Sequence, residues 1–269
     1  MTLLPTELDE ALEAARAVAA EAGALLLEGL LRPKTVTFKG DVNLVTEYDR
    51  RAEDLITSRL GRLFPGFGIL AEEGGVAGKA DAHARWIIDP LDGTTNFSHG
   101  HPVFAVSIGL EDGGTPVAGV VAMPGLGVTV WARRGGGAFR NGEPVRVSNA
   151  AEIGVALVAT GFPYDRRTAR DDNTREYAAF VKRAQGVRRC GAAAVDLALT
   201  ACGVYDGYWE PRLKPWDLAA GVVLVREAGG IATDYEGTEI DIHKGWILAA
   251  GPRLHQPMLE ILRDARRFF

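Results

Sequence analysis

Apolar residues in the first quarter of the chain recur at helical spacing. Over residues 7–31 they fall every three or four positions, behind a cluster of acids, which predicts an amphipathic helix that ends before Pro33. The same period predicts a second helix over residues 46–63, which ends before the sequence Phe-Pro-Gly. The chain is therefore expected to begin with two helices.

Between residues 85 and 147 the period changes to two. Apolar stretches at 103–110, 116–122 and 127–132 are separated by Gly and Pro, which predicts consecutive strands. The sequence Arg-Asn-Gly-Glu at 140–143 predicts a hairpin, because Asn-Gly supplies the positive φ angles of a type I′ turn. An antiparallel meander is expected here.

After residue 148, strand-like and helix-like segments alternate. Strands are expected at 155–160, 205–210 and 246–250, and helices at 172–183, 192–202, 216–228 and 253–263. A meander followed by such units indicates an α+β fold with an α/β C-terminal part. We therefore predict two sub-structures, residues 1–148 and residues 149–269.

Composition and charge narrow the class of protein. The 269 residues are 47% hydrophobic and 24% charged, as in ordinary globular proteins, and the net charge of −5 argues against nucleic acid as a general partner. The N-terminus carries no signal pattern, and the charge-free run 113–132 is broken by glycines and prolines. A cytoplasmic protein without a membrane segment is expected, with Cys190 and Cys202 as free thiols.

Residues 86–97 read Trp-Ile-Ile-Asp-Pro-Leu-Asp-Gly-Thr-Thr-Asn-Phe and carry the most chemistry. Asp89 and Asp92 lie three residues apart after a strand-like stretch, and carboxylates held so close are stable mainly with a cation between them. The Gly-Thr-Thr sequence at 93–95 offers N–H groups and hydroxyls for an anion where a short helix begins. Metal-assisted phosphoryl chemistry is the first hypothesis, and a surface turn is the alternative.

Two other acidic segments stand beside apolar patterns. Glu72 and Glu73 follow the strand-like stretch 67–71, and Asp217 begins a helical pattern that ends at Gly229-Gly230. At the first turn of a helix the charge of Asp217 suits the helix dipole. Each segment alone would be typical of a solvated edge.

Together these segments resemble the inositol monophosphatase family. Its signatures are an Asp-Pro-(Ile/Leu)-Asp-Gly-Thr-Thr-Asn-Phe element and a later Trp-Asp before an Ala/Gly-rich helix. Residues 39–49 match a third element of the family, and residues 191–194 with 206–210 match a fourth. The resemblance spans residues 6–262 and implies a layered αβαβα sandwich, of the type shared with fructose-1,6-bisphosphatase.

The resemblance also implies a set of metal ligands. These are Glu72, Asp89, Asp92, Asp217 and the backbone carbonyl of Leu91. Ligands that are all oxygens favour Mg²⁺ over Zn²⁺. Asp89 is expected to bridge two ions, with a third, weaker ion near Glu72. For Glu73 two alternatives stay open: it supports the metal ligands from behind, or it is simply exposed to solvent.

Activation and substrate binding are assigned in the same way. Thr94 and Glu72 are expected to orient the attacking water, with Asp49 as the acceptor for the Thr94 hydroxyl. Without the resemblance, Asp49 would be an exposed helix acid. The substrate contacts that the resemblance implies are Gly93 and Thr94 for phosphate, and Gly191, Ala192, Ala193 and Glu210 for the hydroxyls of the leaving group. Asp217 is also expected to contact the substrate. Close helix packing is an alternative for 191–194.

The expected activity is hydrolysis of inositol 1-phosphate or a similar small polyol or sugar phosphate. Fructose-1,6-bisphosphatase and NADP(H) or nucleotide phosphatase activities are the alternatives within the superfamily, and a regulatory protein that binds transcription machinery is an alternative of another class. The resemblance further implies inhibition by Li⁺ and a homodimer with contacts near residues 155–164. Arg166, Arg167 and Arg170 form either a solvated face or a site for a second phosphate, whereas His99 and His101 are expected to be loop residues.

Overall fold

A computed structural model describes residues 2–38, 44–79 and 81–267. Residues 39–43, the first half of the third family element, lie outside the described residues. The second half of that element forms strand β2 (Leu44–Thr46), which pairs antiparallel with β1 (Val36–Phe38), and the start of helix α2 (Glu47–Leu63). The predicted second helix is confirmed.

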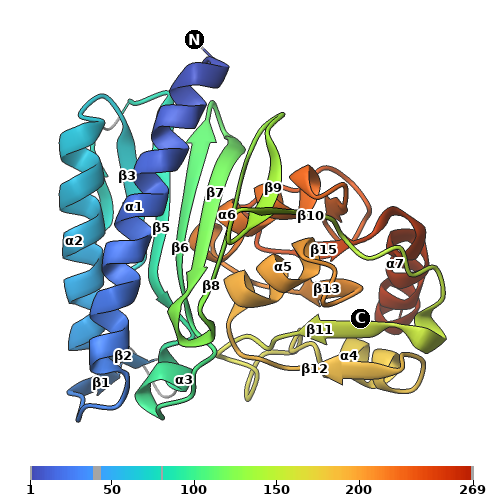
Figure 1. Ribbon diagram of the computed structural model, residues 1–269. Coiled ribbons are helices and arrows are strands. Elements are labelled where there is room, and N and C mark those ends of the chain that lie inside the picture. The colour runs from blue at the N-terminus through green and yellow to red at the C-terminus, as the bar shows by residue number, and fades with distance from the viewer. Residues whose placement is uncertain (1, 39–43, 80, 268–269) are drawn as a thin grey trace.

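The described residues form five stacked layers in the order αβαβα (Figure 1). Helices α1 (Pro5–Leu30) and α2 make the outer layer beside a large sheet, whose strand order is β10-β9-β8-β7-β6-β5-β3-β4. Its strands are β3 (Gly68–Ala71), β4 (Gly75–Gly78), β5 (Ala84–Asp92), β6 (Ala105–Asp112), β7 (Thr115–Met123), β8 (Val128–Arg133), β9 (Gly137–Arg140) and β10 (Glu143–Val145). The predicted sandwich is confirmed.

The large sheet contains the meander that the sequence predicts. Strands β5 to β10 pair antiparallel in chain order, and Asn141 and Gly142 join β9 to β10 with φ angles of 49° and 95°. Strand β3 instead pairs parallel with β5, so the turn after β3 reaches the same edge of the sheet as the end of β5. This pairing brings Glu72 near the Asp89 segment.

A smaller sheet follows in the C-terminal half, with strand order β12-β11-β13-β15-β14. Its strands are β11 (Leu157–Thr160), β12 (Gly186–Arg188), β13 (Gly207–Glu210), β14 (Ile231–Thr233) and β15 (Ile247–Ala250). Strands β11, β12 and β13 are parallel, whereas β15 runs antiparallel to both of its neighbours, so the sheet is mixed. Helices α4 (Thr174–Val181) and α7 (Pro252–Arg266) cover its outer face.

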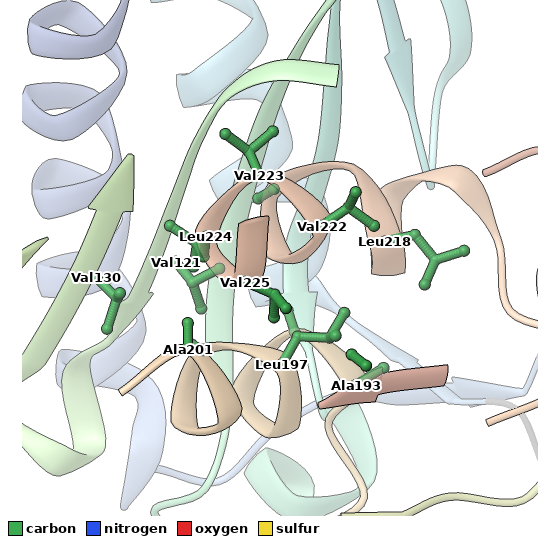
Figure 2. Packing of buried hydrophobic residues seen from close by; sticks show 14 of the residues in the cluster. Val121, Val130, Ala193, Leu197, Ala201, Leu218, Val222, Val223, Leu224 and Val225 are labelled. Carbon is green, nitrogen blue, oxygen red and sulfur yellow. The ribbon is translucent and has the colours of Figure 1, made fainter. Parts of the chain in front are cut away.

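Helices α5 (Ala193–Ala201) and α6 (Pro215–Glu227) form the central layer between the two sheets (Figures 1 and 2). Their apolar side chains, such as Leu197 and Val222, point into one core with Val121 of the large sheet (Figure 2). The approach to the large sheet is close: a Cβ on Gly119 would lie 2.6 Å from the Cα of Ala220. Because the residues of α6 that face the sheet are small, the start of the helix, which carries Asp217, packs directly against the sheet.

The two sheets come from opposite sides of residue 148, yet the central layer belongs to both. Helices α5 and α6 follow the predicted boundary in the chain, but their apolar faces complete the core of the large sheet. The two predicted sub-structures therefore share one helical layer. Within the described residues, no helix is long and apolar enough to cross a bilayer.

Candidate active site

Three carboxylates meet where β5 ends and α6 begins. One oxygen each from Asp89, Asp92 and Asp217 lies within 4.8 Å of the others. A regular strand would point residues 89 and 92 to opposite faces, but the pairing of β5 with β6 shifts between them. This irregularity in the strand turns both carboxylates toward one cavity of about 160 Å³, which Glu72, Leu91 and Gly93 also line.

The chemistry of the cluster fits a hard cation. Burial, followed by the charges of Glu72, Asp92 and Asp217, raises the pKa of Asp89 well above its usual value. Burial and the nearby Asp92 do the same to the pKa of Asp217. Carboxylates so crowded ionise together only when positive charge lies among them, and their donor atoms are the oxygens that Mg²⁺ prefers. The residues present therefore fit a divalent-cation site.

Asp92 has a second partner, the N-terminus of α5. Its two carboxylate oxygens accept hydrogen bonds from the backbone N–H groups of Ala193 and Ala194, at 3.2 and 2.7 Å. Burial raises the pKa of Asp92 to about 6, and these N–H groups oppose the shift. The Ala193 N–H, expected from the sequence to hold a leaving-group hydroxyl, already donates to Asp92.

Thr94 and Asp49 are brought together as predicted. The Thr94 hydroxyl lies 3.0 Å from Asp49 Oδ1 and 3.1 Å from the carbonyl oxygen of Leu91. The other carboxylate oxygen of Asp49 accepts from the N–H and the hydroxyl of Thr46, at 2.7 and 2.6 Å, in a capping box that starts α2. Asp49 is 1% exposed, so its sequence-based alternative as a surface acid is wrong.

A larger cavity of about 430 Å³ adjoins the carboxylate cluster and shares Asp92, Glu210 and Asp217 with it. Glu210 is buried at the end of β13 and accepts a hydrogen bond of 2.5 Å from the Tyr208 hydroxyl. Burial raises the pKa of Glu210 to about 7, against the effect of that hydrogen bond. The cavity is also lined by three of the predicted leaving-group residues, Gly191, Ala192 and Ala193.

Sequence reasoning did not assign Phe162, Tyr164 or Arg189 to the site. Phe162 and Tyr164 line both cavities, and Arg166 and Arg189 line the larger one with His99. Desolvation and the carboxylate charges around it raise the pKa of Tyr164, although this residue is 53% exposed. The sequence left the cluster of Arg166, Arg167 and Arg170 open between a solvated face and a site for a second phosphate. In the structure Arg166 lines the larger cavity, whereas Arg167 and Arg170 are exposed.

The stretch of residues 155–164, predicted to contact a second subunit, is buried in part. Val158 and Ala159 are fully buried within β11, and Phe162 and Tyr164 face the cavities. Val155 and Tyr164 are exposed at the surface, at 61% and 53%. The role of this stretch as a contact region therefore stays a prediction.

A layered αβαβα fold that holds clustered carboxylates beside a polar cavity defines a class of phosphomonoesterases. A sequence profile of the inositol monophosphatase family matches residues 7–267, and the chain belongs to that family.

Individual relatives are similar over nearly the whole chain. The chain is 42% identical to the inositol-1-monophosphatase of Synechocystis sp., over 98% of its own length and 93% of the relative's. It is 40% identical to the Nus factor SuhB of Pseudomonas aeruginosa, over 95% of each chain. The structure of the inositol monophosphatase from Anabaena (Nostoc) sp. superposes with a TM-score of 0.88, at 42% identity and with 96% of each chain covered.

Proposed function

We propose that this protein is a Mg²⁺-dependent phosphomonoesterase that hydrolyses inositol 1-phosphate or a similar small polyol phosphate. The observation that carries the proposal is the junction of two cavities at Asp92 and Asp217. The smaller cavity offers clustered carboxylates for cations, and Glu210, which lines both cavities, is a buried acceptor for hydroxyl groups. A phosphate ester of a polyol needs both environments side by side.

In this proposal the carboxylate cluster would hold two cations, and Asp89 would contribute to both sites. Glu72 and the carbonyl of Leu91 would complete the first site. Asp92 and Asp217 would complete the second, and a weaker third ion would lie near Glu72. When bound, Mg²⁺ would supply positive charge to the phosphate and lower the pKa of a water molecule.

The protein's own groups prepare the attacking water. The Thr94 hydroxyl has one proton, which it donates to Asp49 or to the Leu91 carbonyl, so its lone pairs are left to accept from a water in the cavity. Glu72 is assigned as the second acceptor for that water. The backbone of Gly93 and Thr94 lines the same cavity and would donate to the phosphate oxygens.

Glu210 is assigned to the leaving group. One of its oxygens accepts from Tyr208, which fixes the orientation of the carboxylate in the cavity. The remaining lone pairs would accept hydrogen bonds from hydroxyls of a polyol. The walls formed by Gly191 and Ala192 bring backbone rather than bulky side chains to this space.

A second candidate substrate carries a second anionic group. Arg166 and Arg189 line the larger cavity. Their guanidinium groups could bind a phosphate or carboxylate of the leaving group. This arrangement favours a sugar bisphosphate, such as fructose 1,6-bisphosphate, or a nucleotide with an additional phosphate. The similarity to a Nus factor supports a binding role in transcription as a separate proposal. A homodimer is proposed from the family resemblance alone.

A substrate panel tests the proposal. Phosphate release should be measured side by side from inositol 1-phosphate, fructose 1,6-bisphosphate, NADP⁺ and 3′-phosphoadenosine phosphate. We expect the highest kcat/KM for inositol 1-phosphate. A higher kcat/KM for any of the three substrates that carry more than one phosphate group, lost in Arg166→Ala and Arg189→Ala, would instead establish the second candidate.

A further inference from the structure

Helix α2 carries a second buried acid besides Asp49. Glu53 lies four residues later, one helical turn away on the same face, and is 6% exposed. Its carboxylate reaches the turn between β3 and β4. A buried carboxylate is retained only when its oxygens are hydrogen-bonded, so the partners of Glu53 indicate what it does.

Glu53 binds the backbone directly after Glu72. Its two oxygens accept from the N–H groups of Glu73 and Gly74, at 2.8 and 2.6 Å. Two successive N–H groups directed at one carboxylate fix the direction of the chain at that point. The contact is close, because a Cβ on Gly74 would lie 2.8 Å from Glu53 Oε1.

The backbone of Glu72 is also held on its other side. The Glu72 N–H donates to the carbonyl oxygen of Ile88, at 3.2 Å, and Ile88 directly precedes Asp89. Glu72 is thus held between the strand that carries Asp89 and the carboxylate of Glu53. Loss of the Glu53 contacts would free one side of this short turn.

We propose that Glu53 is a positioning residue that holds Glu72 in place and thereby sets the affinity of the cation site to which Glu72 contributes. The inference rests on the proposed function for the assignment of Glu72 as a ligand. Helix α2 then supports two parts of the site: Asp49 orients Thr94, and Glu53, one turn later, orients Glu72.

The test is Mn²⁺ binding by the metal-free, full-length protein, followed through the EPR signal of free Mn²⁺. Glu53→Gln removes one of the two acceptor oxygens. Gly74→Ala disturbs the same contact through the turn, because the added methyl group displaces the Glu53 carboxylate. Loss of a supporting hydrogen bond weakens a metal site by about 10-fold or more. We therefore expect about 10-fold weaker Mn²⁺ binding at one class of sites for Glu53→Gln, and a change in the same direction for Gly74→Ala.

Matched controls separate this effect from a general one. Asp54→Asn removes the exposed acid next to Glu53, and Gly66→Ala adds a methyl group where no atom lies within 4 Å. Both should bind Mn²⁺ like the wild type. In activity assays, Glu53→Gln should raise the half-saturating Mg²⁺ concentration by a similar factor and keep most of kcat at saturating Mg²⁺, which a merely unstable variant would not do.

Wild-type Mn²⁺ affinity in both Glu53→Gln and Gly74→Ala would overturn the proposal, as would an equal loss in Asp54→Asn. If Glu53→Gln shows no cooperative thermal transition, Gly74→Ala alone decides in the same way. The proposed function fails separately: a wild type that binds Mn²⁺ but hydrolyses no phosphomonoester would disprove it, and the titration would still decide the role of Glu53.

Discussion

The hydroxyl of Thr94 lies 3.0 Å from Oδ1 of Asp49, although 45 residues separate them in the chain. The contact exists because the first turn of α2 meets the end of β5, where the short helix α3 (Thr94–Ser98) begins. Asp49 is the third residue of α2, where its side chain completes the capping box with Thr46, and it is also the acceptor for Thr94. One carboxylate therefore couples the start of a helix to the orientation of a hydroxyl in the cavity.

Thr94→Ala and Asp49→Asn should each lower kcat strongly and change KM little. They orient the nucleophile and do not hold the leaving group, and groups of this kind contribute about 10²–10⁴-fold. Because the two residues act as a unit, the double variant should lose far less than the product of the single losses. Steady-state kinetics on the three variants would measure this.

Ser98→Ala is the matched control, since the Ser98 hydroxyl in the same helix α3 donates to the nearby carbonyl of Thr95. It should keep wild-type kcat. Asp49→Asn should also lose about 1 kcal/mol of stability through its capping box, which thermal melting can separate from the kinetic effect. Multiplicative losses in kcat would show that Thr94 and Asp49 act independently.

Glu210 should govern the choice of leaving group. Glu210→Ala should reduce kcat/KM for inositol 1-phosphate by about 1–3 kcal/mol, the scale for polar groups left without partners. Turnover of p-nitrophenyl phosphate, which offers no hydroxyls, should barely change. Tyr208→Phe should show a weaker form of the same pattern, because Tyr208 orients the carboxylate. Equal losses on both substrates would place Glu210 among the cation ligands.

The raised pKa of Glu210 predicts a pH-dependent stability. In the folded protein burial raises this pKa to about 7 from 4.5, so the folded state keeps a proton that the unfolded chain loses between these values. The stability contributed by this proton is complete below pH 4.5 and declines as pH rises to about 7. Melting temperatures in EDTA should therefore fall more steeply over this range for the wild type than for Glu210→Gln. If the melting temperatures of the wild type and of Glu210→Gln fell in parallel with pH, the raised pKa of Glu210 in the folded protein would be contradicted.

The seating of α6 on the large sheet should be sensitive to one methyl group. In Gly119→Ala the added Cβ meets the backbone of Ala220, and a backbone segment within a helix cannot avoid the clash by a change of rotamer. We therefore expect a loss of about 1–3 kcal/mol in stability. Mg²⁺ affinity should fall with it, because the start of α6 carries Asp217. Gly154→Ala, where no atom lies within 4 Å, is the control for chemical denaturation and for Mg²⁺ titration. Unchanged stability in Gly119→Ala would show that the layers adjust freely.

Local patterns predicted the helices and strands, because periodicity and motif spacing are properties of short segments, whereas the acidic cluster was implied by the resemblance to the family. The helix at Asp217 and the hairpin at Asn141-Gly142 follow from such signals. The contacts of Asp92 with α5 and of Glu53 with the turn after β3 do not, since they depend on how distant elements pack. The irregularity in β5 also escaped prediction, although it is what turns Asp89 and Asp92 toward one cavity.

The loop from Gly161 to Arg166 illustrates the same limit. Its apolar start resembles a surface for association, and Arg166 belongs to a cluster that the sequence left open between a solvated face and a site for a second phosphate. The position of this loop depends on the topology, because the chain leaves β11 beside the carboxylate cluster and Phe162 and Tyr164 then line both cavities. Residues such as Tyr164 acquire their surroundings only through this topology.

The most direct test of the central claim is phosphate release from inositol 1-phosphate as Mg²⁺ is titrated into the metal-free protein. The account predicts no activity in EDTA, recovery at millimolar-scale Mg²⁺, and a loss on the order of 10³-fold in Asp89→Asn, which removes a ligand shared by two charge-stabilising ions. Undiminished hydrolysis in the presence of chelator, or near-wild-type activity in Asp89→Asn, would contradict it.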